Sequence, residues 1–413
     1  MRISTAQTFN TGIDQLQQRQ RDLARTQQQL SSGKRVERAS DDPSAAARAE
    51  RALASEARGQ ASQRALETSR HAMTLTEGAL GDAGELMQQA REALVAAGNG
   101  SYSDAERVGV ADRLSALRQQ LLATANRGNG DGGFLFAGQG GSQPPFVDAV
   151  GGVSFRGTSG AVQLVSDEPL PRSIDGQAAW LASPSGNGLF ETRNASSAPN
   201  GSGTWIDAGQ VRDLAAFYTA TSPPAAAIPA TLTYRLAFSG TAASPTFSVT
   251  KDGAATALVN VAYVSGQTIA IDGMEFTVEG NPASGDGFEI RLATPSLGVF
   301  DTLARAIAEL KTPLRSNAAV TQSVQRALSD LDGSMVALQS LRSQVGEVLN
   351  HADRVEGRIA AQSISAQTER SNAEDLDMLA ALSRFEAQQT GYQAALKTYA
   401  SVQRLSLFDF LNL

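Results

Sequence analysis

The chain has 413 residues, with 42 acidic side chains against 35 Lys and Arg, and no cysteine. This length predicts more than one domain. The mildly acidic balance argues against binding nucleic acid through bulk positive charge, and the lack of cysteine excludes disulfides, thiolate metal sites and cysteine nucleophiles.

No apolar run approaches the ~20 residues of a membrane-spanning helix. The N-terminal residues MRISTAQTFNTG lack the charged, apolar and small-residue regions of a cleaved signal peptide. We therefore expect no membrane insertion, and we expect any export to use a route that needs no cleaved signal peptide.

Residues 3–30 carry a heptad pattern. Its positions alternate in steps of four and three, and two of them are glutamine: Phe9, Ile13, Leu16, Gln20, Leu23, Gln27 and Leu30. This spacing places one stripe along a helix that supercoils with a partner. The stripe is thin and isolated helices are marginal in water, so we expect a segment that becomes ordered in an assembly. A surface helix on a globular core is the alternative.

A joint between two helices follows. Ser31–Gly33 can end the first helix, because glycine readily takes a positive φ. Ser40 or Asp41 can cap the second, with Pro43 in its first turn and acidic groups at its positive end. A short basic run lies between them: Lys34, Arg35 and Arg38.

Pro43–Ala97 then reads as one long helix, ended by Gly98–Gly100. Its heptad line is Thr76, Leu80, Ala83, Met87, Ala90, Leu94 and Ala97. Ser103–Glu106 is a capping box and opens a helix through about Asn126. One face of that helix is apolar: Val110, Leu114, Leu117, Leu121 and Ala125.

Gly128–Gly141 is a glycine-rich stretch around Phe134–Phe136. It lacks the Gly-Lys-Ser/Thr ending of a phosphate-binding P-loop and the setting of a dinucleotide site. We expect a hairpin that leads into a new domain.

Residues 143–295 change in composition and indicate a β-rich insertion. Short alternating runs separated by turn signals predict strands: 153–155, 162–165, 232–238, 246–250, 259–264, 268–271, 275–279 and 288–292. A helix is possible at Ala208–Ala220, and Ser183–Gly203 is expected to be a loop.

Helix resumes at 297–310 and is interrupted by Pro313. Asn317 to about Asn372 has the strongest seam: Val324, Leu328, Leu331, Met335, Leu338, Arg342, Val345, Leu349, Ala352, Glu356 and Ile359. The last segment continues with Leu382, Phe385, Gln389, Tyr392, Leu396 and Tyr399 and has an apolar end. That end indicates a surface for a partner; a terminus tucked into its own core is the alternative.

The fold class that follows is α+β and multidomain. Both ends form a long antiparallel helical bundle or coiled coil, and a β-rich domain is inserted between them. His71 and His351 have no nucleophile and carboxylate set at a recognised spacing. Asp41–Asp42 and Glu374–Asp377 are expected to be caps or solvated charge. We therefore predict no catalytic residue, no cofactor and no metal site.

Both ends resemble the bacterial flagellin superfamily, over about residues 1–141 and 297–413. Leu30–Pro43 is similar to the family's early LSSGKR…DD signature. Within the family, the closest similarity is to proteins of the hook–filament junction. It is carried by MRIST at the start, SDDP at 40–43, the NGSYSD, LLATAN and DGGFLFAG runs with PPF between 99 and 146, and LSLFDFL at 405–411.

The resemblance implies a structural, non-enzymatic flagellar protein that joins the hook to the filament; a divergent flagellin is the alternative. Residues 1–38 with 373–413 would be inner-tube helices, disordered in the monomer. Residues 39–142 with 297–372 would be a helical bundle, and 143–296 an outer β-rich domain.

Several partners are implied as well. They are a ring of identical subunits, the proximal junction protein, flagellin and a cytoplasmic export chaperone, with no nucleic acid. Export would use the flagellar type III apparatus, without signal cleavage, and place the protein outside the cell.

The expected assembly residues lie in the terminal helices and the joint. They are Phe9, Ile13, Leu16, Leu23, Leu30, Lys34, Arg35, Arg38, Phe385, Tyr392, Leu396, Tyr399, Leu405, Phe408, Phe410 and Leu411. An adhesin or enzyme in the β-rich insertion, and a coiled-coil scaffold unrelated to flagella, are further alternatives.

Overall fold

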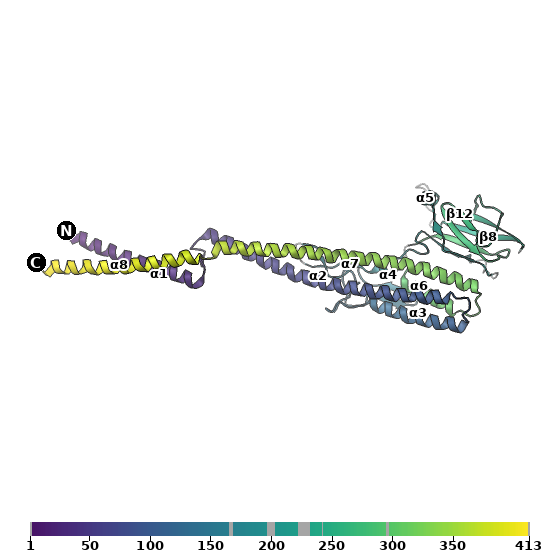
Figure 1. The fold of residues 1–413 in the computed structure, drawn as a ribbon, viewed down its shortest axis with the longest axis horizontal. Coiled ribbons are helices and arrows are strands. Elements are labelled where there is room, and N and C mark those ends of the chain that lie inside the picture. The colour runs from purple at the N-terminus through teal and green to yellow at the C-terminus, as the bar shows by residue number, and fades with distance from the viewer. Residues whose placement is uncertain are drawn as a thin grey trace. The chain divides into compact units, whose positions relative to one another are not determined.

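The computed structural model describes residues 2–164, 168–195, 203–221, 232–241, 243–294 and 297–411. Near the two chain ends, side chains are described only for residue 7 and between residues 10 and 401. The chain divides into two compact units. The terminal unit comprises Met1–Arg64 and Arg354–Leu413, and the central unit comprises Ala65–Asp353. Long helices from both ends with a β-rich region between them confirm the predicted fold class (Figure 1).

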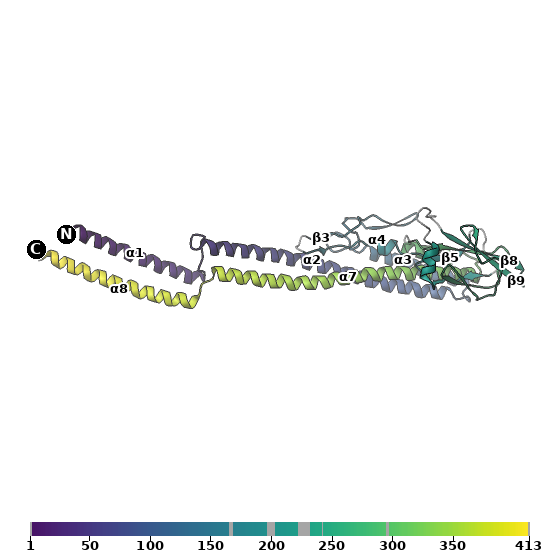
Figure 2. The same ribbon diagram turned by 90° about the horizontal axis from the view of Figure 1, so that it is seen from above.

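The terminal unit contains two antiparallel helix pairs. In the first, α1 (Arg2–Ser32) lies beside α8 (Met378–Leu411), with their free ends at the same end of the pair (Figure 2). Two glycines mark the close approaches. A Cβ on Gly12 would lie 3.6 Å from the Tyr399 ring, and one on Gly391 would lie 2.9 Å from the Arg19 guanidinium.

The second pair is made by the first part of α2 (Pro43–Ala97) and the last part of α7 (Asn317–Glu374). An ion pair of 2.8 Å joins Glu56 to Arg370. The buried side chains here are mostly small: Ala45, Ala49, Ala52, Val355, Ile359, Ala366 and Ala373. This pair therefore buries little apolar area per turn.

The helices of the central unit bury larger side chains. The rest of α2 packs with α7, α3 (Asp104–Ala125) and α6 (Val299–Lys311). The whole predicted α2 line from residue 76 to 97 is buried, and the predicted capping box, Ser103 with Glu106, is present at the start of α3. Both observations confirm the sequence-based expectations.

Three ion pairs set the register of α2 against α7 in the central unit. Arg70 pairs with Asp353 at 2.7 Å, and Arg91 pairs with Asp332 at 2.8 Å. Between them, the Arg342 Nε donates to Glu77 at 2.9 Å. Partner numbers fall on α7 as they rise on α2, so the two helices are antiparallel, as predicted.

The predicted seam of α7 is half right. The positions seven apart from Val324 to Ile359 are buried as expected. The other half of the seam was placed one residue too late: the buried positions are Ala327, Ser334, Leu341 and Val355, with Val348 partly buried. Arg342 is exposed and forms the ion pair with Glu77. Both frames keep a 3-4 alternation; Leu328, Met335 and Leu349 are partly buried against the same core, beside the more deeply buried Ala327, Ser334 and Leu341.

A small-sheet region packs against the helices of the central unit. It comprises β1 (Phe146–Ala149), β2 (Gly152–Phe155), β3 (Gln163–Leu164), β4 (Leu170–Pro171) and α4 (Gln177–Leu181). Trp180 stacks on Phe300 of α6 with ring centroids 5.8 Å apart, and Phe136 and Phe146 meet the Trp180 ring edge-on. Part of the range predicted as an insertion, 143–296, thus shares the core of the helices.

The β-rich core consists of two sheets of antiparallel strands, which pack around a shared set of apolar side chains. The first sheet has the order β10 (Ala254–Ala255), β9 (Ser244–Lys251), β8 (Thr233–Thr241), β14 (Gly287–Leu292) and β5 (Phe190–Asn194), and β11 (Val261–Ala262) also pairs with β9. The second has the order β12 (Thr268–Ile271), β13 (Met274–Glu279) and β6 (Trp205–Ile206), and β7 (Gln210–Val211) also pairs with β13.

Each of the eight predicted strands overlaps an observed one, and two other expectations in this region need correction. β5 lies within Ser183–Gly203, which was expected to be a loop; only Phe190 and Thr192 face inward there, so the alternation was short. The helix expected at Ala208–Ala220 is α5 (Leu214–Thr221), because the preceding residues form β7 instead.

Two buried side chains of α7 hold the β-rich core on the helices. The Asp330 carboxylate accepts from the Gly186 N–H at 2.7 Å, and the Gln322 amide oxygen accepts from the Ile206 N–H at 2.7 Å. Burial raises the pKa of Asp330, against the effects of the Gly186 hydrogen bond and of Arg305. These acceptors satisfy backbone donors that would otherwise be buried without partners.

Candidate assembly site at the joint and the terminal helices

The joint between α1 and α2 begins where the sequence predicted. α1 ends at Ser32, and Gly33 has φ +70°, a value that suits glycine. The Gly33 N–H donates to the Gln29 carbonyl at 2.9 Å and closes the last turn.

The cap of α2 is Asp42, rather than Ser40 or Asp41 as predicted. One oxygen of the Asp42 carboxylate accepts from the backbone N–H groups of Ser44 and Ala45, at 3.1 and 3.0 Å. These bonds, mainly that from Ala45, with the Ser44 hydroxyl and Arg35, lower the pKa of Asp42 to about 2. The carboxylate therefore stays charged at the positive end of the helix.

Asp41 has a different role. Its carboxylate accepts from the backbone N–H of Arg38 at 3.0 Å and pairs with Arg25 of α1 at 3.0 Å. The Arg38 hydrogen bond is the main reason that the pKa of Asp41 is lowered. Asp41 thus folds the turn before the helix and ties it back to α1.

The structure shows that the joint has a second half, which was not predicted from the sequence. The break between α7 and α8 lies against the break between α1 and α2. The Arg35 N–H donates to the Glu374 carbonyl at 2.6 Å, and the Leu376 N–H donates to the Gly33 carbonyl at 2.9 Å. Lys34 and Asp375 form an antiparallel bridge. The two chain crossings are therefore fastened to each other.

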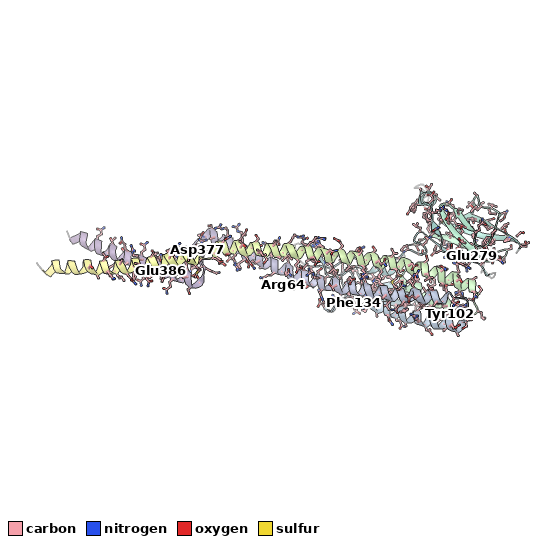
Figure 3. All side chains as sticks on the ribbon, in the orientation of Figure 1. Arg64, Tyr102, Phe134, Glu279, Asp377 and Glu386 are labelled. Carbon is pink, nitrogen blue, oxygen red and sulfur yellow. The ribbon has the colours of Figure 1, made fainter. Side chains whose placement is uncertain are left out.

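The acidic cluster Glu374–Asp377 takes part in this joint, as caps and ion-pair partners. Asp377 lies at the start of α8, and its carboxylate accepts from the Ala380 N–H at 3.0 Å (Figure 3). Glu374 pairs with Lys34 at 3.1 Å. Asp377 is a cap, one of the two roles expected for these acids, whereas the pairing of Glu374 with the first joint was not foreseen.

Two of the three predicted basic contact residues are already engaged within the chain. Lys34 binds Glu374, and the Arg35 guanidinium binds Asp42 at 3.2 Å and the Ala373 carbonyl at 2.7 Å. The Arg38 side chain is exposed and forms no ion pair among the described residues, although its charge helps to lower the pKa of Asp41. Their predicted role between subunits stays a prediction, for which Arg38 is the freest of the three.

The predicted residues of α1 and α8 fall on two helices that pack together. The positions in the seam are half-buried: Ile13, Leu16, Leu23, Leu30, Phe385, Tyr392 and Tyr399. The side chains of Phe9, Leu405, Phe408, Phe410 and Leu411 lie outside the described residues, although these positions belong to α1 and α8.

The frame of α8 shows the same one-residue shift as that of α7. Ala381 is buried, and Gln388 and Ala395 are half-buried in the seam. Leu382 and Leu396, which the sequence placed in the seam, are 50% and 42% exposed. α8 therefore has an inner face of aromatic and small residues and an outer face that carries leucines.

No catalytic or metal-binding site is recognisable among the described side chains. They contain no group of three His, Asp or Glu residues placed to hold a metal ion. His351 lies 3.5 Å from Glu168, and His71 is exposed. No described helix is long and apolar enough to cross a membrane.

Comparison with known families matches both ends of the chain. The model of the bacterial flagellin N-terminal helical region covers residues 3–140, and that of the C-terminal helical region covers residues 328–411. The chain belongs to the flagellin superfamily. The two matched regions contain α2, α3, α8 and the joint, nearly all of α1 and most of α7.

Two curated relatives match this flagellin-family chain from end to end. Both are named flagellar hook-associated protein 3, from Salmonella typhimurium and from Escherichia coli. Each is 24% identical over 417 aligned residues, which cover 99% of this chain and 99% of the relative. The match therefore includes the β-rich region as well as the ends.

Solved structures have the same fold. Flagellar hook-associated protein 3 from Legionella pneumophila has a TM-score of 0.68 at 24% identity, over 75% of this chain and 94% of that one. FlgL from Xanthomonas campestris has a TM-score of 0.67 at 24% identity, over 78% of this chain and 99% of that one. A second structure from Legionella pneumophila, the flagellar junction protein FlgL, is 26% identical with a TM-score of 0.63, over 71% and 95%.

Proposed function

We propose that this chain is a structural subunit of the bacterial flagellum that joins the hook to the filament. The observation that carries the proposal is the end-to-end match to two proteins named hook-associated protein 3, together with flagellin family models at both ends. A filament flagellin would share the ends, but the relatives also match across the region between them.

The subunit works by assembly rather than by catalysis. Its partners are further copies of itself in a ring, the proximal hook-associated junction protein and flagellin. A cytoplasmic chaperone shields the C-terminal segment before export, and the flagellar type III apparatus exports the chain without cleaving a signal. The protein then acts outside the cell as part of the flagellum.

The chain has three layers in this proposal. Residues 1–38 with 373–413 form the inner tube and are disordered in the monomer. Residues 39–142 with 297–372 form the helical bundle, and 143–296 lie on the outside. The layering is supported by the joint, which interrupts both crossings of the chain at one place, and by the thin seam of α1 and α8.

The thin seam supports ordering by assembly for a physical reason. The inner face of α8 alternates Phe385, Tyr392 and Tyr399 with Ala381, Gln388 and Ala395, and α1 offers half-buried leucines against it. One two-helix pair leaves much of each apolar side chain in water. Neighbouring copies would bury the remainder, which is the usual source of stability for long helices in proteins.

A null mutant and complementation test the proposed function. Cells that lack the gene should build hooks without attached filaments, and the wild-type chain should restore the filaments. A chain that ends at residue 404 should fold its central unit and fail to restore them. Filaments on hooks of the null mutant would contradict the proposal, and long filaments formed by the purified chain alone would favour a divergent flagellin.

A further inference from the structure

Three exposed arginines in the first part of α2 take part in no ion pair among the described residues. They are Arg48, Arg51 and Arg58, of which Arg51 donates to the Ala47 carbonyl of its own helix at 3.2 Å; Arg38 in the joint differs, because its charge helps to lower the pKa of Asp41. The arginines between α2 and α7 differ, because Arg70, Arg91 and Arg342 each bind a carboxylate across the seam. The free arginines are therefore not needed to hold α2 on α7.

The three arginines of α2 share one flank of the helix. At 100° per residue, Arg51 and Arg58 lie about 20° apart and Arg48 about 60° from Arg51. Arg48 and Arg51 line an open cavity of about 410 Å³ at the end of α7, with Glu369, Asn372 and Ala373. Beside the Glu369 carboxylate, the cavity offers two guanidinium groups and a side-chain amide to an incoming carboxylate, a good partner for arginine.

A second part of the exposed face of α2, about 100° around the helix from Arg51, carries a carboxylate. Relative to the buried line Ala45, Ala49 and Ala52, Arg51 lies about 130° to one side and Glu50 about 130° to the other. Glu50 is exposed, and no ion pair involves it among the described residues. Leu53, on the same side as Glu50, is 40% exposed. One helix therefore presents a basic flank and, at the same height, a second flank with one carboxylate and an exposed leucine.

We infer that α2 binds a second copy of this chain through these two flanks. The arginine flank of one copy receives Glu50 and Leu53 of the next copy, so the contact is head-to-tail. Because the two flanks differ, every copy can use both, and copies at the same height close into a ring when the rotation allows it. The inference rests on the proposed function and names the contact between its subunits.

The proposed basic contact therefore lies on α2 rather than in the joint. Lys34 and Arg35 use their charges inside the chain, whereas Arg48, Arg51 and Arg58 form no ion pair among the described residues and can bind a neighbour. A contact between exposed charges weakens with salt, because ions screen it within about 10 Å at 0.1 M. The contact therefore sets orientation and neighbour spacing more than overall stability.

Cross-linking tests this contact directly, because the chain has no cysteine of its own. Three null strains are complemented: one with Arg51→Cys, one with Glu50→Cys and one with both variants together. Detached flagella are treated with a short bis-maleimide, since an Arg–Glu pair holds its backbones farther apart than the ~6 Å of a disulfide. We expect covalent dimers only in the strain that makes both variants.

Arg113→Cys is the matched control. Arg113 is an exposed arginine of α3 in the central unit with no carboxylate partner among the described residues; it should give no dimer with Glu50→Cys. Dimers from Arg51→Cys alone would indicate a two-fold contact and overturn the inference. Restored filaments without any dimer from the mixed strain would overturn it too.

Charge reversal gives a second, independent measure. Arg51→Glu or Glu50→Arg alone should lower the number of filaments per cell severalfold, and producing the two variants together should recover part of that loss. No loss from either variant would contradict the inference. If the wild-type chain itself restores no filaments, the proposed function fails. Cross-linking of the same mixtures of concentrated purified chain then tests the contact alone, and absence of the mixed dimer overturns it.

Discussion

The two units are built from similar long helices but bury very different side chains. In the central unit, α2 and α7 pack with α3 and α6 around leucine, methionine and a stack of Trp180 on Phe300. In the terminal unit, the same two helices bury mainly alanines, and α1 and α8 bury their seam only halfway. Since apolar burial contributes roughly 25 cal/mol per Å², helix length alone does not make the terminal unit stable.

The difference fits the two tasks that the proposed function requires. The central unit contains its own core and can fold within one chain. The terminal unit has fewer apolar contacts and therefore opens more easily by itself. Its exposed leucines and arginines remain for neighbours, so assembly can supply the stability that a single chain lacks.

The largest effect is expected from the aromatic core. Trp180→Ala should destabilise the central unit by about 3–5 kcal/mol, because it removes a fully buried ring that meets Phe136, Phe146 and Phe300. Denaturant unfolding followed by circular dichroism measures this loss. A change below about 1 kcal/mol would show that the core tolerates the cavity and would weaken the contrast between the units.

A smaller effect is expected where α7 holds the β-rich core. Asp330→Ala leaves the Gly186 N–H buried without its acceptor and should cost about 1–3 kcal/mol in the unfolding of the central unit. Asp330→Asn is the matched control, since its amide oxygen can still accept that bond. Equal stability of the two variants would contradict this role of the carboxylate.

The same carboxylate predicts a pH dependence. Burial raises the pKa of Asp330, so the folded chain binds more protons than the unfolded chain just above pH 3.8. Stability should therefore fall as pH rises from about 3.8 through the raised pKa, and Asp330→Asn should remove this component. Unfolding midpoints of both proteins between pH 4 and 7 measure it, and identical pH profiles would contradict it.

A local effect is expected at the joint. The pKa of Asp42 is lowered to about 2, so its cap is present above pH 3.8 and is lost as the pH falls through about 2. Asp42→Ala should increase amide exchange in the first turn of α2 at neutral pH, whereas Asp42→Asn should largely preserve protection. Unchanged exchange at Ser44 and Ala45 in the alanine variant would show that the cap is unimportant.

The smallest effect on the single chain is expected at Leu382. Because Leu382 is 50% exposed, Leu382→Ala should change the stability of the terminal unit by less than about 0.5 kcal/mol. Phe385→Ala, on the half-buried inner face, should cost more. For assembly we expect a clear effect: Leu382→Ala should reduce the number of filaments that the chain restores in the null mutant. A larger loss of single-chain stability from Leu382→Ala than from Phe385→Ala would contradict the observed frame of α8.

Helix boundaries could be read from the sequence where local signals are strong. Gly33, Pro43 and the Ser103–Glu106 capping box mark ends that the structure confirms. The frame of α7 and α8 could not be read as well, because steps of three and four both keep a heptad. The larger Leu382 and Leu396 were preferred over Ala381 and Ala395, which allow closer helix packing.

The features that could not be predicted from the sequence depend on contacts between distant segments. Glu374 and Leu376 have no local pattern that predicts their hydrogen bonds to the first joint, more than 300 residues away. β5 is too short for its alternation to be recognised without its partner β14. The free arginines became informative only once the structure showed which other arginines are paired.

Hydrogen exchange on the free chain and on assembled flagella tests the central contrast most directly. We predict that amides of α1 and α8 exchange rapidly in the free chain, while those of α3 and of strands β8 and β14 are protected. In assembled flagella, α1 and α8 should become protected as well. Protection of α1 and α8 in the free chain equal to that of α3 would contradict the account.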